Sequence, residues 1–151
     1  MKSWSLAASA VAALLACGHA AAQFKNPDDA IEYRQGALAV MGNHFSRIGA
    51  MASGKVPFDA KAVQANADLV ATLAKLPWSA FIEGSDKGDT SARPDVWSQA
   101  DKFRAAAQKL EDATVKLAAA ARTGNQAAVK AAYAAAGETC KSCHDDFRKK
   151  H

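Results

Sequence analysis

A C-x-x-C-H run close to the C-terminus most restricts what this 151-residue chain can fold into. It is formed by Cys140, Cys143 and His144. This spacing is the attachment signature of a c-type haem: the two thiols form thioethers with the haem vinyl groups, and the adjacent imidazole binds the iron. Offsets of 0, 3 and 4 residues share one face of a helix. The motif therefore predicts a helix that carries one covalent heme c, with His144 as the metal ligand.

Two other kinds of site also use paired cysteines. A structural zinc site needs a second pair of ligands at suitable spacing, and the sequence offers none. A redox C-x-x-C motif lies near a β-α-β pattern, whereas Cys140 lies in an alanine-rich, helical segment. Haem attachment is therefore the interpretation that we adopt.

The N-terminal segment has the pattern of a secretory signal peptide, residues 1–22. A basic start at Lys2 precedes an apolar stretch over residues 6–16 and three alanines before Gln23. The apolar stretch is too short to remain as a membrane span, which needs ~20 residues. We therefore expect export to the periplasm and a mature domain over residues 23–151. An alternative is a lipoprotein processing site that would anchor the chain through Cys17.

Charge and cysteine content narrow the range of partners. The net charge is only +4, and the basic residues are scattered apart from a cluster at residues 148–150. This distribution does not indicate a nucleic-acid partner, and no later segment is apolar enough to span a membrane. With Cys17 removed and the other two cysteines holding haem, no disulfide is expected.

The composition predicts an all-α protein. Alanine makes up about a quarter of the chain, β-branched residues are few, and no segment alternates as a strand does. Capping residues, prolines and glycines predict four helices. Their expected bounds are Pro27 to about Ser53, Asp59 to about Pro77, Pro94 to Gly124, and Asn125 to about Phe147. A long loop with a short turn at residues 78–81 is expected between the second and third helices.

Each of the four helices has an apolar, inward face. The residues concerned are Ile31, Leu38, Met41, Phe45 and Ile48 in the first; Val63, Val70 and Leu73 in the second; Val96, Phe103, Leu110 and Leu117, spaced seven residues apart, in the third; and Val129, Tyr133, Ala136, Cys140, His144 and Phe147 in the fourth. Such faces pack together in an antiparallel four-helix bundle, in which facing helices can enclose a cofactor.

Three further segments give the chain a resemblance to a known family. They are N-P-D-D-A-I-E-Y-R-Q at 26–35, L-P-W-S-A-F at 76–81 and R-P-D-V-W at 93–97. Together with the terminal C-x-x-C-H motif, they resemble cytochrome c′, the high-spin class II c-type cytochromes, over residues 23–151. The resemblance implies that His144 is the proximal ligand and that the sixth iron position lies empty beneath Leu38. Leu38 could also be an ordinary core residue of the first helix.

The resemblance also implies roles for five other residues. Arg34 and Gln35 match a pair near the haem propionates, Arg148 matches an arginine over the proximal side, and Trp78 and Phe81 match aromatic residues of the pocket. Each has a simpler alternative: a solvated pair on the first helix, a partner of the last helix dipole, and core packing at the root of the loop. The loop over residues 82–92 is longer than in typical members, so a propionate contact from Asp89 is not expected.

Three residues are alternative ligands for the sixth iron position, which would then not be empty beneath Leu38. Met41 is the strongest, because a methionine on the first helix completes the iron in low-spin relatives of this fold. It could equally fill the core. Met51 and His44 are weaker candidates, and His44 is expected at a surface or interface because it is rotated away from Leu38.

The resemblance gives two candidate functions. A five-coordinate iron behind an apolar lid binds NO and CO, whereas O₂ would lack a stabilising hydrogen-bond donor. Electron transfer to an unidentified redox partner is the second. We expect no enzymatic activity and no catalytic residue, because the pocket offers no distal acid or base. The resemblance also implies a homodimer through the first two helices, with Gly42 and Gly49 allowing close approach.

Overall fold

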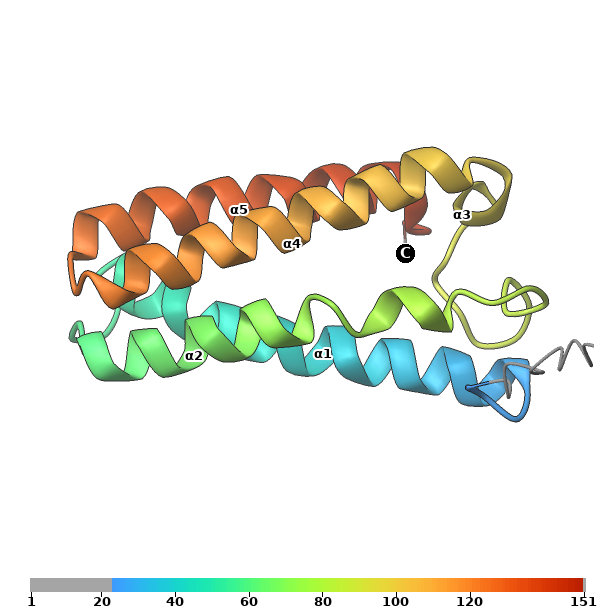
Figure 1. Ribbon diagram of the computed structural model, residues 1–151, viewed down its shortest axis with the longest axis horizontal. Helices are drawn as coiled ribbons and strands as arrows, with labels where there is room; N and C mark the ends of the chain where they lie inside the picture. Colours follow the sequence, from blue (N-terminus) through green and yellow to red (C-terminus); the bar gives the residue numbers. More distant parts are fainter. Residues whose placement is uncertain (1–22, 151) are drawn as a thin grey trace, which may run out of the picture.

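The computed structural model describes residues 23–150 of the chain (Figure 1). Its helices are α1 (Pro27–Ala52), α2 (Ala60–Leu73), the 3-10 helix η1 (Pro77–Ala80), α3 (Asp95–Ser98), α4 (Ala100–Arg122) and α5 (Gln126–Phe147). The signal peptide predicted at residues 1–22, and the alternative at Cys17, lie outside the described residues. Within residues 23–150, no helix is both long and apolar enough to cross a membrane.

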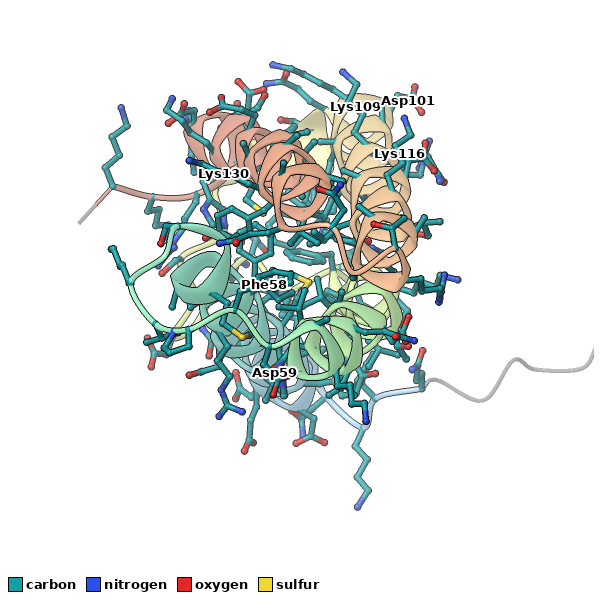
Figure 2. The ribbon with its side chains drawn as sticks, turned by 90° about the vertical axis from the view of Figure 1, so that its left-hand side faces the viewer. Phe58, Asp59, Asp101, Lys109, Lys116 and Lys130 are labelled. Carbon is teal, nitrogen blue, oxygen red and sulfur yellow. The ribbon has the colours of Figure 1, made fainter. Side chains whose placement is uncertain are left out.

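The four long helices form an antiparallel bundle, which confirms the predicted fold class. Figure 1 shows α1 beside α2 and α4 beside α5, with the two pairs stacked on each other. At the end viewed in Figure 2, Phe58 points toward the middle of the bundle, whereas Lys109 and Lys116 project from the outer side of α4. The loop between η1 and α3 lies at the opposite end, next to the end of α5.

Three of the four long helices, α1, α2 and α5, begin at the predicted capping residues. Asn26 caps α1 by accepting a hydrogen bond from the N–H of Asp29 at 2.9 Å, and Pro27 follows at the first helical position. Asp59 and Asn125 cap α2 and α5 in the same way. Because these signals are local, they place the helix starts within a residue or two.

The prediction of one continuous helix from Pro94 to Gly124 is wrong. Gln99 adopts φ −119° and ψ 44°, which separates the single turn of α3 from α4. The indole of Trp97 donates to the carbonyls of Phe81 and Ile82, at 3.2 and 3.1 Å, and so ties α3 to the preceding loop. The seven-residue apolar spacing continues across this break, so periodicity alone could not reveal it.

The core consists of two clusters of buried side chains. The larger one joins all four long helices and includes Ile48, Val63, Leu117 and Val129. The smaller one is aromatic and lies beneath the C-terminal end of α5; its members include Val96, Phe103, Phe147, Trp78, Phe81 and Trp97. All four residues of the predicted heptad from Val96 to Leu117 are buried.

Gly49 packs α1 against α5 inside the bundle. A Cβ atom at this position would overlap the phenol end of Tyr133, and the Tyr133 ring is itself stacked on Phe45 with centroids 4.2 Å apart. The expectation that Gly49 would admit a second copy of the chain is therefore wrong, because it meets Tyr133 of its own chain.

We predict that Gly49→Ala destabilises the protein, because the added methyl must push apart Tyr133 and α1. Overpacking of this kind lowers the free energy of unfolding by about 1–3 kcal/mol, which outweighs the gain of up to about 1 kcal/mol from replacing a helical glycine. Gly36→Ala is the matched control, since a Cβ there meets nothing within 4 Å; it should raise the free energy of unfolding by up to about 1 kcal/mol. Denaturant unfolding of both variants checks this, and equal effects would contradict the assignment.

Candidate cofactor site

A cavity of about 660 Å³ lies at the loop end of the bundle. Volumes of roughly 300–1,000 Å³ are typical of cofactor sites. Its walls come from all four long helices, from η1 and α3, and from the segment between η1 and α3, and most of the lining side chains are apolar. They include Leu38, Met41, Phe45, Val70, Trp78, Phe81, Phe103 and Leu110.

Cys140, Cys143 and His144 all line this cavity from α5. Neither cysteine forms a disulfide within the described residues. Burial raises the pKa of Cys140, and burial together with nearby Cys140 and Asp146 raises the pKa of Cys143 to about 11. Both thiols are therefore protonated near neutral pH. The three residues of the motif open into one apolar space, as the sequence predicted.

The imidazole of His144 is suited to metal ligation. Burial, followed by the nearby cation of Arg148, lowers its pKa. The neutral form, which has a free nitrogen lone pair for a metal, is therefore dominant at pH 7. Two thiols, a neutral imidazole and an apolar cavity of this size fit a covalent haem.

The cavity opens to solvent between α1 and α5. Gln35, Ala39, Gly42 and Ser46 follow one another along α1, and all four are exposed while also lining the cavity. On α5, the His144 side chain is partly buried against the cavity and partly accessible to solvent. Sequence reasoning missed Ala39 and Ser46, because small residues on an otherwise polar face give no signal of a cofactor.

Arg34 is buried, with only 2% of its surface exposed, so the alternative of a solvated pair is wrong for this residue. Its guanidinium donates to the carbonyl of Ala80, to both the hydroxyl and the carbonyl of Ser85, and to the hydroxyl of Thr90, at 2.6–3.0 Å. It also lies over the Phe81 ring, 4.5 Å from the centroid. Four of its N–H donors thus bind η1 and the loop, and these bonds do not use its Nε–H.

Gln35 differs from its neighbour. Its side chain is exposed, and its amide donates to the carbonyl of Asp89 at 2.9 Å. Both residues of the R-Q pair therefore hold the loop over residues 82–92 against α1. Ser85 and Thr90, which complete this arrangement, were missed by sequence reasoning because isolated hydroxyl residues in a loop carry no distinguishing pattern.

The structure reduces the candidates for the sixth iron position. Leu38 and Met41 both line the cavity. Met51 is buried in the larger core, and His44 lies in the α1–α2 seam, where its Nδ1 is 2.7 Å from Oδ1 of Asn66. Neither Met51 nor His44 lines the cavity. The remaining alternatives are an empty sixth position beneath Leu38 and coordination by Met41.

Trp78 and Phe81 line the cavity and also pack in the core, so the two interpretations of these residues are compatible. Trp78 is anchored by its indole N–H, which donates to the carbonyl of Ala74 at 2.7 Å. Both rings lie against Phe103, with centroids 5.8 and 4.7 Å away.

Arg148 lies just beyond the last residue of α5, four residues after His144. The helix ends at Phe147, and Arg148 is extended, with φ −110° and ψ 135°. Its backbone forms an antiparallel bridge with Ala92, which competes with continuation of the helix. Arg148 nevertheless lines the cavity beside His144.

Fold and site together define a class of protein: a four-helix bundle with a C-terminal site for a c-type haem. Residues 29–148 match the family described as Cytochrome C′. A cytochrome c′ from Rubrivivax gelatinosus is 54% identical over 129 residues, which is 85% of this chain and all of the relative. The chain belongs to the cytochrome c′ family, whose members bind c-type haem covalently.

Solved structures of relatives have the same fold. The crystal structure of cytochrome c′ from Rubrivivax gelatinosus has a TM-score of 0.82 and covers 84% of this chain and 100% of its own. A nitric oxide complex of a leucine-to-alanine variant of cytochrome c prime from Alcaligenes xylosoxidans has a TM-score of 0.81 at 42% identity, covering 85% of this chain and 100% of its own.

We predict that Arg34→Lys is strongly destabilising despite its retained charge. A single ammonium group cannot reproduce the forked bonds to Ser85 and Thr90, and hydrogen bonds to charged groups contribute about 1.5–3 kcal/mol each. The free energy of unfolding should fall by about 2–4 kcal/mol. Arg47→Lys, on the exposed surface of the same helix, should change it by less than about 0.5 kcal/mol. Equal losses would show that the bonds of Arg34 are not what the loop depends on.

Proposed function

We propose that this protein is a periplasmic haem protein with a five-coordinate iron that binds NO and CO. In this proposal Cys140 and Cys143 hold the haem covalently and His144 ligates the iron. Leu38 covers the empty position. The observation that carries the proposal is that Leu38, which cannot coordinate iron, lines the cavity from α1 while His144 lines it from α5.

The remaining predicted residues have supporting roles in this proposal. Trp78 and Phe81 pack against the bound group, and Arg148 lies beside it on the His144 side. Arg34 has one N–H left to offer a propionate, and Gln35 stands at the solvent edge of the cavity. Export through residues 1–22 supplies the periplasmic location.

The apolar side of the cavity supports selectivity for uncharged diatomic gases. When haem is bound, its iron supplies a site that can take such a gas or an electron. Leu38 and Met41 offer no hydrogen-bond donor, so a polar O₂ adduct is not stabilised, whereas NO and CO do not need one. A nitric oxide complex has been solved for a relative from Alcaligenes xylosoxidans. The lack of an acid or base among these α1 residues also favours gas binding over enzymatic turnover.

Electron transfer is the second candidate function. It is favoured by the opening between α1 and α5, where Ala39, Gly42 and Ser46 are small and exposed. Such an opening leaves one edge of a bound haem accessible to a partner.

Optical spectra test the proposed coordination. The wild-type protein should be high-spin in both oxidation states and should bind NO and CO. Leu38→Ala removes the lid and opens space, so gas association should accelerate, whereas Met41→Leu should leave the spectrum unchanged. A low-spin wild type that became high-spin in Met41→Leu would identify Met41 as the sixth ligand, and the function would then be electron transfer alone.

A homodimer through α1 and α2 is also part of this proposal. Most of the exposed large apolar side chains of the described residues lie on or beside these helices: Tyr33, Val40, Val56, Leu69 and Leu76. The contact between His44 and Asn66 sets the register of the antiparallel pair, so Val40 and Leu69 lie at similar heights. Exposed apolar side chains at similar heights on two neighbouring helices are typical of protein–protein contacts.

We predict that light scattering gives a dimer mass at micromolar concentration, and that Val40→Glu or Leu69→Glu gives a monomer. These side chains are 47% and 45% exposed, so burial in an interface would leave an introduced carboxylate without water. Val115→Glu, on α4 and 50% exposed in the wild type, is the control and should leave the dimer intact. A monomeric wild type would refute the proposed assembly.

A further inference from the structure

Four polar or charged side chains are buried among the described residues, and three of them belong to one network. These three are Arg34, Ser85 and Thr90; the fourth is Thr114. The network joins α1 to the segment over residues 82–92, which we call the strap. We propose that the strap holds the residues that follow His144 against the cavity, and that Thr90 is the positioning residue that couples both ends.

The first end of the strap is fixed to α1. Arg34 donates to the Ser85 hydroxyl at 2.6 Å, to the Ser85 carbonyl at 2.7 Å and to the Thr90 hydroxyl at 2.8 Å. Gly88 has φ +84°, and a Cβ there would lie 3.2 Å from a carboxylate oxygen of Asp28. Glycine thus allows the left-handed turn and the close approach that bring the strap onto α1.

The second end of the strap is fixed to the chain beyond α5. The backbone N–H of Lys149 donates to the carbonyl of Ser91 at 2.8 Å, and the N–H of Arg93 donates to the carbonyl of Phe147 at 2.9 Å. Between these two bonds lies the bridge that pairs Ala92 with Arg148. The backbone of Arg148 is therefore held on both sides, one turn beyond His144.

Thr90 belongs to both sets of contacts. Its hydroxyl oxygen accepts from the guanidinium of Arg34 and from the N–H of Ala92, at 2.8 and 3.1 Å. Its carbonyl accepts from the ammonium group of Lys149 at 3.0 Å. A single residue thus connects the helix that carries Leu38 to the segment that carries Arg148.

The buried charge of Arg34 keeps the strap in place against α1. Its acceptors in the described residues are neutral oxygens of the strap and of Ala80, so release of the strap would leave a buried cation short of partners, which is costly. Thr90, Ala92 and Arg148 all line the cavity. The strap therefore keeps Arg148 in the cavity wall beside His144. This role rests on the proposed haem function.

Amide hydrogen exchange of the haem-loaded protein tests the strap. Thr90→Val keeps the side-chain shape and the backbone carbonyl but removes the hydroxyl acceptor. Exchange at the N–H groups of Lys149 and Arg93 should accelerate by about tenfold or more, as expected when a hydrogen bond to a charged group is lost. Thr72→Val is the control, because within residues 23–150 the Thr72 hydroxyl donates to the carbonyl of Asp68 in its own helix, at 2.9 Å. Unchanged exchange in Thr90→Val, or equal acceleration in both variants, would overturn the inference.

A second variant keeps the test decisive if Thr90→Val does not fold. Lys149→Met removes only the ammonium bond to Thr90, and Lys150→Met is the adjacent control. Exchange at the N–H of Arg93 in the haem-loaded protein should be faster in Lys149→Met than in Lys150→Met, and equal rates would refute the coupling. Neither readout depends on iron coordination, so failure of the strap and failure of the proposed gas-binding function can be told apart.

Discussion

The burial of the Arg34 guanidinium is the interaction on which the open end of this bundle depends. A buried cation requires a full set of hydrogen-bond acceptors, and α1 cannot supply them. The long loop before α3 therefore has to come to α1, where Ser85 and Thr90 provide the oxygens. The loop in turn pairs with the chain that follows α5. One buried charge thus organises the wall of the cavity.

The two ends of the bundle are packed differently. At the end away from the loop, Gly49 lets α1 approach the Tyr133 ring of α5, and the larger apolar cluster fills the space between all four helices. At the loop end, α1 and α5 must stay apart to leave a cavity of about 660 Å³. There, hydrogen bonds to the loop and an aromatic cluster replace direct helix-to-helix packing. The cavity between α1 and α5 stays open because its walls are held in place by the loop and by the aromatic cluster, and not by direct contact between these two helices.

The environment of the C-x-x-C-H motif matches its chemistry. Burial raises the pKa of both thiols and lowers the pKa of His144, so all three groups are uncharged near neutral pH. An apolar cavity tolerates such groups without a counter-charge. Membership of the cytochrome c′ family is consistent with this arrangement, and the choice between Leu38 and Met41 at the sixth position then decides between gas binding and electron transfer alone.

The sequence by itself determined the features that depend on neighbours in the chain. The haem motif, the caps at Asn26 and Asn125 and the apolar faces of the long helices are local patterns, and each could be predicted. Tertiary structure decided the rest: the burial of Arg34, the break at Gln99, the contact of Gly49 with Tyr133 and the extended backbone of Arg148. Each of these depends on a partner distant in the sequence. Helix propensity and periodicity carry no information about such partners, because they describe only how a segment folds and which of its faces is apolar.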